Sequence, residues 1–265
     1  MYKTILQSIV GSTVHGMAVS DGLEDLDLMS VVIEDADTFV GTCREQEGMY
    51  IWEQRDSWLH RSKPEGVRSE AGDIDHVLYG LRKYMKLLLK SNPSVIIPLF
   101  APPEMLKVCT SEGRELRALA LSVMSKRAHA SFKGYMHQQH QRLLGTAGQK
   151  NCTRPELIER YGYDTKYAGH IVRLGFQGVE LLMHGRLTLP LPERERAFCI
   201  EVRTGKYTLD QVSQEITQLE HQLDIAHTLS PLRDEPDIAL VQAWVVDKYH
   251  AHWAGVPVLA QHDYR

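Results

Sequence analysis

The sequence predicts an α+β fold, with a small mixed sheet and its helices over residues 1–103 and an all-helical region over residues 104–265. Two observations support this division. The first third carries short runs rich in β-branched residues, which are typical of strands, whereas the rest carries apolar residues at i, i+3, i+4 helical spacing. Ala101-Pro102-Pro103 is the clearest linker and marks the expected domain boundary.

The first region begins with an apolar segment, residues 4–10, whose pattern fits a short helix or a strand and leads into Gly11-Ser12. Residues 26–34 and 73–79 read as strands. A helix with Leu81, Met85, Leu88 and Leu89 at helical spacing follows and stops at Asn92-Pro93. Between residues 37 and 68 the pattern is poor, and we expect one further strand and a loop.

Helical periodicity dominates the second region. Helices are expected over residues 112–129, 131–144, 164–184, 209–229 and 237–253. Thr208 to Gln211 has the signature of a capping box. The stretch RLTLPLP (186–192) is an extended connector because its two prolines exclude a helix. The charge run at residues 194–196 is expected to be a solvated loop.

Composition fits a globular protein with a core, since apolar residues make up 43% and charged residues 24% of the 265 residues. Lys and Arg total 30 against 34 Asp and Glu, a formal net charge of −4. No overall basic field exists to coat nucleic acid, although a local basic groove is not excluded.

Cysteine usage and apolar runs indicate where such a chain works. The cysteines at positions 43, 109, 152 and 199 form no C-x-x-C pair, which argues against a zinc finger and against a disulfide framework. The N-terminal residues do not form a secretory signal, and no apolar run is long enough to span a bilayer. We therefore expect a reducing compartment, most simply the cytoplasm, and no membrane partner.

Two aspartates at the start of the strand at residues 26–34 are the first candidate site. Strand alternation places Asp25 and Asp27 on the same side, with Leu26 and Leu28 expected to face the core. Such close carboxylates repel unless a divalent cation neutralises them, and Asp73 or Asp75 would complete the site. The turn at Gly11-Ser12 can offer N–H groups and a hydroxyl to phosphates. The alternative is a solvated acidic loop.

Three segments carry a resemblance to a known family: VGSTVHG (10–16), LDLMSVVIE (26–34) and DIDHVLY (73–79). Together they resemble the pattern of the DNA polymerase β-like nucleotidyltransferase superfamily. Residues 72–100, the stretch ERYGYDTKYAGHIVRLGFQGVELL (159–182) and GRLTLPLP (185–192) are similar, more closely, to predicted bacterial and phage nucleotidyltransferases associated with RNA repair. The resemblance covers roughly residues 1 to 195, and its implied first domain is a minimal nucleotidyltransferase domain.

The resemblance implies roles for the aspartates. Asp25 and Asp27 would be catalytic and would bind Mg²⁺ or Mn²⁺, with Asp75 as the third ligand and catalytic residue and Asp73 as the alternative. Gly11 and Ser12 would bind nucleotide phosphates. One departure concerns the loop before the first aspartate. Many members read S-D-x-D directly, whereas residues 22–24 here separate Ser20-Asp21 from Asp25, which leaves Asp21 as a spare carboxylate.

A second cluster follows one face of the helix at residues 164–184. Lys166, His170, Arg173 and Gln177 form a continuous polar stripe, whose simplest interpretation is a solvated face. Glycines at positions 169, 175 and 178 each cost about 1 kcal/mol relative to Ala, which indicates a close approach. The resemblance to the family motif GYDTKYAGH, in a helical domain that closes over the nucleotide, implies that Lys166, His170 and Arg173 contact triphosphate or acceptor.

The resemblance implies transfer of a nucleoside monophosphate from an NTP to a hydroxyl, with release of pyrophosphate. The acceptor would be an RNA 3′ end, such as damaged tRNA, and a basic stripe at residues 82–90 favours RNA. The net charge favours the first alternative, a protein-AMPylating, antitoxin-type or small-molecule enzyme. The second alternative is a non-catalytic nucleotide-binding interaction protein. Base preference and oligomeric state are left open.

Several histidines are expected to be structural. His137 and His140 lie three apart and are expected on a solvated helix face. His250 and His252 have the wrong helical spacing for one metal ion. His15, inside VGSTVHG, is the histidine best placed to touch a nucleotide, but the sequence gives it no role.

Overall fold

The computed structural model describes residues 2–18, 26–36, 39, 43–46, 49–52, 59–61, 74–145 and 154–255. Its sheet has five strands in the order β5-β6-β2-β1-β7, and a separate pair joins β3 (Cys43–Gln46) to β4 (Met49–Trp52). The sheet strands are β1 (Tyr2–Ile9), β2 (Leu26–Glu34), β5 (Leu59–Arg61), β6 (Ile74–Gly80) and β7 (Leu106–Cys109). The α+β prediction is therefore confirmed, and residues 4–10 form a strand up to Ile9.

Strand pairing sets which side chains share a face of the sheet. β2 pairs antiparallel with β1 and parallel with β6, and in this register Asp27 lies opposite Asp75. Met29, Val31 and Ile33 belong to the main hydrophobic core, so Asp27 lies on the core face at the open end of β2. The prediction that Leu26 and Leu28 face the core is wrong, because the apolar run further along β2 decides the face.

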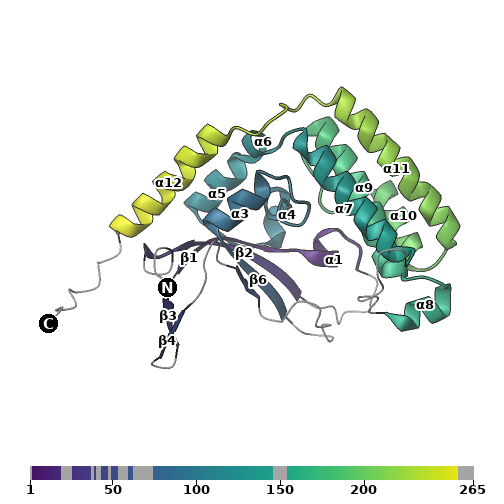
Figure 1. Cartoon of the computed structure of the whole chain (residues 1–265), viewed down its shortest axis with the longest axis horizontal. Coiled ribbons are helices and arrows are strands. Elements are labelled where there is room, and N and C mark those ends of the chain that lie inside the picture. Colours follow the sequence, from purple (N-terminus) through teal and green to yellow (C-terminus); the bar gives the residue numbers. More distant parts are fainter. Residues whose placement is uncertain are drawn as a thin grey trace.

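One face of this sheet is covered by α3 (Leu81–Leu88), α4 (Ile97–Phe100) and α5 (Ser111–Ala118) (Figure 1). The C-terminal helix α12 (Ile238–Ala254) returns to contact β2 and α3. Strand β7 also lies beyond residue 103 and pairs with β1. The expectation that only helices follow residue 103 therefore missed one strand, and the exact domain boundary stays a prediction.

A second group of helices is built around α9 (Thr165–His184), which contacts α7 (Arg127–Leu143), α8 (Pro155–Tyr161), α10 (Glu193–Arg203) and α11 (Leu209–Leu229) (Figure 1). This helical group differs from the prediction at three places. Residues 194–196 belong to α10 rather than to a loop, α8 was not expected, and the helix predicted over 112–129 is divided among α5, α6 (Ala120–Val123) and the start of α7. α11 has the predicted bounds and its capping box is present.

The glycines of α9 are explained by helix packing. A Cβ on Gly169 would lie 2.5 Å from Cγ of Arg203 on α10, and one on Gly175 would lie 2.8 Å from Cβ of Leu219 on α11. A Cβ on Gly178 would lie 2.7 Å from Cδ2 of Leu223, also on α11. The close approach that these glycines indicated in the sequence is therefore the packing of neighbouring helices against α9.

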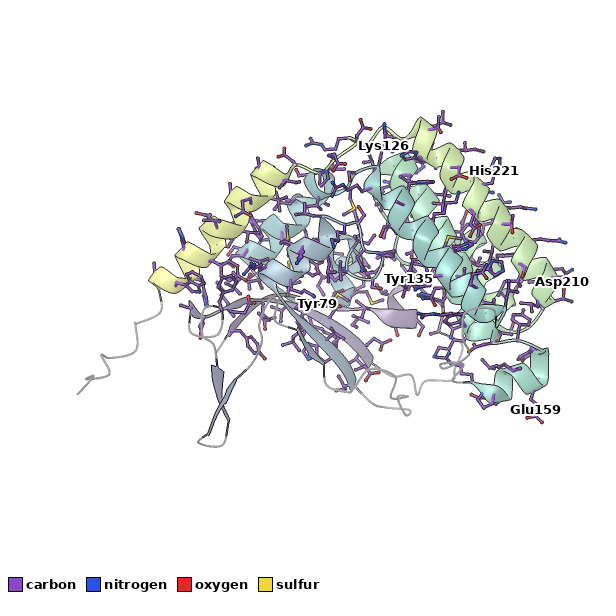
Figure 2. The ribbon with its side chains drawn as sticks, viewed as in Figure 1. Tyr79, Lys126, Tyr135, Glu159, Asp210 and His221 are labelled. Atoms are coloured by element: carbon purple, nitrogen blue, oxygen red, sulfur yellow. The ribbon has the colours of Figure 1, made fainter. Side chains whose placement is uncertain are left out.

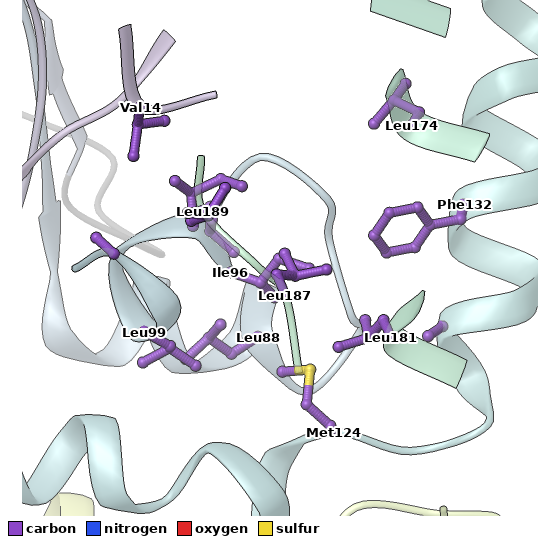
Figure 3. Packing of buried hydrophobic residues seen from close by; sticks show 14 of the residues in the cluster. Val14, Leu88, Ile96, Leu99, Met124, Phe132, Leu174, Leu181, Leu187 and Leu189 are labelled. Carbon is purple, nitrogen blue, oxygen red and sulfur yellow. The ribbon is translucent and has the colours of Figure 1, made fainter. Parts of the chain in front are cut away.

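One hydrophobic core runs from the sheet into the helical group. Figure 3 shows Leu187 and Leu189 of the connector at residues 186–192 close to Ile96, and Leu181 and Phe132 further into the helical group. All five side chains are buried in the same cluster. The connector links α9 to α10 along the chain, and its buried side chains also pack the helical group against the sheet region.

Helix α12 is fixed to the sheet by a buried carboxylate. The Tyr249 hydroxyl donates to Oε2 of Glu34 at 2.5 Å, and the Leu81 amide donates to the same oxygen at 3.3 Å. The Trp253 indole donates to the Glu34 carbonyl at 2.9 Å. Burial raises the pKa of Glu34, because it removes water from the carboxylate. The hydrogen bonds from Tyr249 and Leu81 partly replace that lost solvation.

We expect Tyr249→Phe to lower the free energy of unfolding by about 1–3 kcal/mol, because a buried acceptor loses its shortest donor. Urea unfolding followed by circular dichroism measures the change. Tyr161→Phe, on α8 in the helical group, is the matched control and should have a smaller effect. Equal unfolding midpoints for Tyr249→Phe and the wild type would contradict the assigned role of this contact.

Candidate active site

A cavity of about 320 Å³ lies where the ends of β1 and β2 meet α9 and α10. It brings together predicted site residues from both halves of the chain. Its polar lining consists of Gly11, Ser12, His15, Asp27, Ser94, Lys166, His170, Arg173 and Arg203. Apolar side chains, among them Met17, Met29 and Leu174, form the rest of its wall.

The turn after β1 is shaped to hold Asp27. Gly11 opens the short helix α1 (Gly11–Val14) with a φ of +68°, a conformation that glycine adopts without strain. A Cβ at this position would lie 1.8 Å from Oδ2 of Asp27, so the carboxylate packs directly against the glycine backbone. The Val10 amide donates to the Asp27 carbonyl at 2.9 Å, which ties the turn to β2. A side chain at position 11 would displace the carboxylate.

Asp27 and Asp75 are direct partners across the parallel pair of β2 and β6. Register partners on parallel strands project to the same face, so the two carboxylates form one side-by-side acidic pair. Asp25 and Asp73 lie outside the described residues, as does Asp21. Among the described residues, no group of three His, Cys, Asp or Glu side chains forms a metal site. The carboxylate pair is nevertheless the oxygen donor set that Mg²⁺ or Mn²⁺ prefers.

Cationic side chains form the opposite wall. Lys166 is exposed in the first turn of α9, whose N-terminus is capped by Asp164, with Oδ1 accepting from the Tyr167 amide at 2.9 Å. Arg154 donates to the other oxygen of Asp164 at 3.3 Å. Arg203 reaches the cavity from α10 and donates to the Met17 carbonyl.

The sequence analysis missed Arg203 because it placed residues 194–196 in a loop. Apolar residues at positions 198, 199 and 202 have helical spacing and are packed or buried in the structure. This spacing was the signal that could have revealed α10 and its last residue, Arg203.

Arg173 lies at the centre of a buried polar network. Its Nη1 donates to Nε2 of His15 at 2.8 Å and to Oε1 of Gln177 at 2.6 Å, and its Nη2 donates to Nδ1 of His170 at 2.7 Å. His15 belongs to the turn after α1, so this network joins the sheet region to α9. Tyr135 of α7, labelled in Figure 2, meets the His170 ring edge-on at 6.2 Å.

Both imidazoles of this network are held neutral. Burial, reinforced by the Arg173 charge, lowers the pKa of His170 to about 3 and lowers that of His15 well below its ordinary value. Burial also lowers the pKa of the Arg173 guanidinium, to about 10, which leaves it charged at neutral pH. The network therefore combines one cation with neutral partners.

The other histidines of interest make structural contacts. His140 is buried, not solvated as predicted, and its Nε2 lies 3.2 Å from the Ser213 hydroxyl of α11. His252 pairs with Asp35 at 2.8 Å.

In the basic stripe of α3, Arg82 lies over the Phe39 ring at 5.4 Å.

A larger cavity of about 890 Å³ lies along α9, α10 and α11. Its lining mixes carboxylates such as Glu180 and Glu215 with cations such as Arg186 and Arg194. It contains neither the Asp27 and Asp75 pair nor the Gly11-Ser12 turn. We therefore place the candidate active site in the smaller cavity.

Within the described part of the chain, no helix is both long and apolar enough to cross a membrane.

Comparison with known proteins identifies the family. No curated protein matches the sequence. A nucleotidyltransferase-like protein from Exiguobacterium sibiricum is a structural match at 10% identity and a TM-score of 0.29, covering 85% of this chain and 69% of that one, and this similarity supports no further conclusion. A family model described as "RNA repair pathway DNA polymerase beta family" matches residues 1–247, which include both walls of the cavity, and the chain therefore belongs to this family, RlaP.

Proposed function

We propose that the protein is a metal-dependent nucleotidyltransferase that moves a nucleoside monophosphate from an NTP to a hydroxyl acceptor. The observation that carries the proposal is the arrangement of charge in one cavity, where Asp27, partnered by Asp75, faces Lys166, Arg173 and Arg203. Membership of a polymerase β family with an RNA repair description supports the same reaction class.

The two walls match the two parts of a metal-bound triphosphate. The carboxylates attract divalent cations, and the cations of α9 and α10 attract phosphate oxygens. Asp25, Asp27 and Asp75, with Asp73 as the alternative to Asp75, would hold Mg²⁺ or Mn²⁺. When bound, the metal would neutralise the phosphates and lower the pKa of the attacking hydroxyl.

The chain's own residues then orient and stabilise. Gly11 and Ser12, in the turn beside Asp27, bind phosphate oxygens, and Lys166 and Arg203 stabilise the negative charge of the departing pyrophosphate. The acceptor oxygen attacks the α-phosphorus while its proton passes to the Asp75 carboxylate. The bond from the α-phosphorus to the bridging oxygen breaks, and pyrophosphate leaves. No covalent enzyme intermediate is required.

The acceptor that we propose is the 3′ hydroxyl of RNA, with damaged tRNA as the first candidate. The family description supports this choice. Two exposed cations, Lys86 in the last turn of α3 and Lys90 in the turn that follows the helix, could contact a phosphate backbone. A protein or small-molecule acceptor would use the same metal site, so the test below includes those acceptors. Cytoplasmic location remains part of this proposal.

We expect Asp27→Asn and Asp75→Asn each to lower nucleotide incorporation about 100-fold or more, because each removes charge that organises the transition state. The assay follows α-labelled ATP, CTP, GTP and UTP into tRNA, generic RNA or protein with Mg²⁺ or Mn²⁺. Asp210→Asn, an exposed aspartate in the first turn of α11, is the matched control and should retain activity. Label in protein instead of RNA would reassign the acceptor. A fully active Asp27→Asn variant would contradict the assigned site.

We expect Lys166→Ala to weaken NTP binding about tenfold, with a smaller effect on stability, because the side chain is exposed and its charge faces the cavity. The loss should shrink as salt is added, since phosphate attraction at an exposed site is screened. Calorimetric titration with a non-hydrolysable NTP, at low and at high salt, measures the loss of affinity and its salt dependence. Arg160→Ala, on the exposed face of α8, is the control. Equal affinity in the Lys166→Ala and Arg160→Ala variants would remove Lys166 from the phosphate site.

A further inference from the structure

His15 occupies a position that neither the proposed chemistry nor the sequence motif explains. The residue is only 4% exposed, yet it lines the cavity beside Gly11 and Ser12. Its carbonyl accepts from the Leu191 amide at 3.3 Å, which ties the turn to the connector at residues 186–192. Its side chain reaches Arg173, on the other wall of the cavity.

The donor chemistry of arginine fixes the protonation state of His15. A guanidinium has N–H donors and no acceptor, so Nε2 of His15 must offer a lone pair to Arg173. The proton of the neutral ring then sits on Nδ1. The same reasoning places a lone pair on Nδ1 of His170. Gln177 Nε2 lies 3.3 Å from Nδ1 of His15, and since both atoms are donors in this state, that contact is not a hydrogen bond.

Arg173 is a buried cation that has no carboxylate partner among the described residues. It is 8% exposed, and its three hydrogen-bond partners among the described residues are two neutral imidazoles and an amide. An ion removed from water is costly unless an opposite charge compensates it. Since Arg173 lines the cavity, an anion in that cavity would supply the compensation.

We propose that His15 is a positioning residue that aims the Arg173 guanidinium at the polyphosphate of the substrate. Neutral Nε2 of His15 accepts from Nη1, and Nδ1 of His170 accepts from Nη2, so the guanidinium is held from two sides. Its remaining donor capacity is then turned to the cavity. The inference rests on the proposed function in one respect, that the cavity receives a nucleotide triphosphate.

The test uses inorganic tripolyphosphate with Mg²⁺ as the probe, titrated into the full-length protein in a calorimeter. We expect His15→Leu to weaken binding about tenfold or more, since a hydrogen bond to a charged group is lost. His15→Gln, which restores a neutral acceptor, should bind within about threefold of the wild type on the same scale. His137→Leu, an exposed histidine of α7, should bind like the wild type.

Each outcome separates this proposal from the proposed function. If the wild type binds tripolyphosphate and His15→Leu binds equally well, the positioning role is wrong and the proposed function stands. If His15→Gln binds as poorly as a folded His15→Leu variant, the acceptor role is also wrong. If the wild type itself does not bind the probe, the proposed function is wrong, and the positioning role that rests on it is wrong as well.

A spectroscopic measurement tests the contact even if His15→Leu fails to fold. Nitrogen-15 NMR of histidine-labelled wild-type protein at neutral pH distinguishes the two neutral tautomers and the imidazolium. We expect His15 as the Nδ1–H tautomer and His170 as the Nε2–H tautomer. An imidazolium or an Nε2–H tautomer at His15 would overturn the proposal, because neither can accept from Arg173.

Discussion

The buried charge of Arg173 is the constraint on which the candidate site depends. In a water-poor interior, a guanidinium costs several kcal/mol unless its surroundings compensate it. Here two imidazoles kept neutral and the Gln177 amide accept its hydrogen bonds. These three hydrogen bonds use three of the five guanidinium N–H donors and do not neutralise the charge. The resulting positive potential lies across the cavity from Asp27 and is available to an anionic ligand.

This network needs both halves of the chain to be packed together. His15 lies after α1 in the sheet region, whereas its partners lie on α9. Leu187 and Leu189 of the connector are buried in the core that spans both, and the glycines of α9 bring α10 and α11 close to it. Close contact with α10 is also what brings Arg203 to the cavity. Core packing and the cationic wall are therefore products of the same helix contacts.

The sequence predicted those features whose local pattern agrees with the final structure. α9 and α11 have clear periodicity and caps, and the stripe of Lys166, His170 and Arg173 does face the cavity. The face of β2 was predicted wrongly because Leu26 and Leu28 lie before the apolar run that enters the core. Strand β7 and helix α10 were missed because tertiary pairing and a dense charge run conceal weak local signals. The link between His15 and Arg173 joins residues far apart in sequence, which no local spacing reveals.

The geometry also bears on how a nucleotide would bind. The resemblance implies a helical domain that closes over its substrate, and this closure stays a prediction. In the structure the cationic wall of the cavity is already assembled, since Arg173 and Arg203 both contact the turn region at residues 15–17. A wall held by buried hydrogen bonds and a shared core loses little further entropy when a ligand binds. Preorganised charge of this kind also stabilises charge that develops during phosphoryl transfer without reorganising first. The ordering cost of binding would then fall mainly on the acceptor.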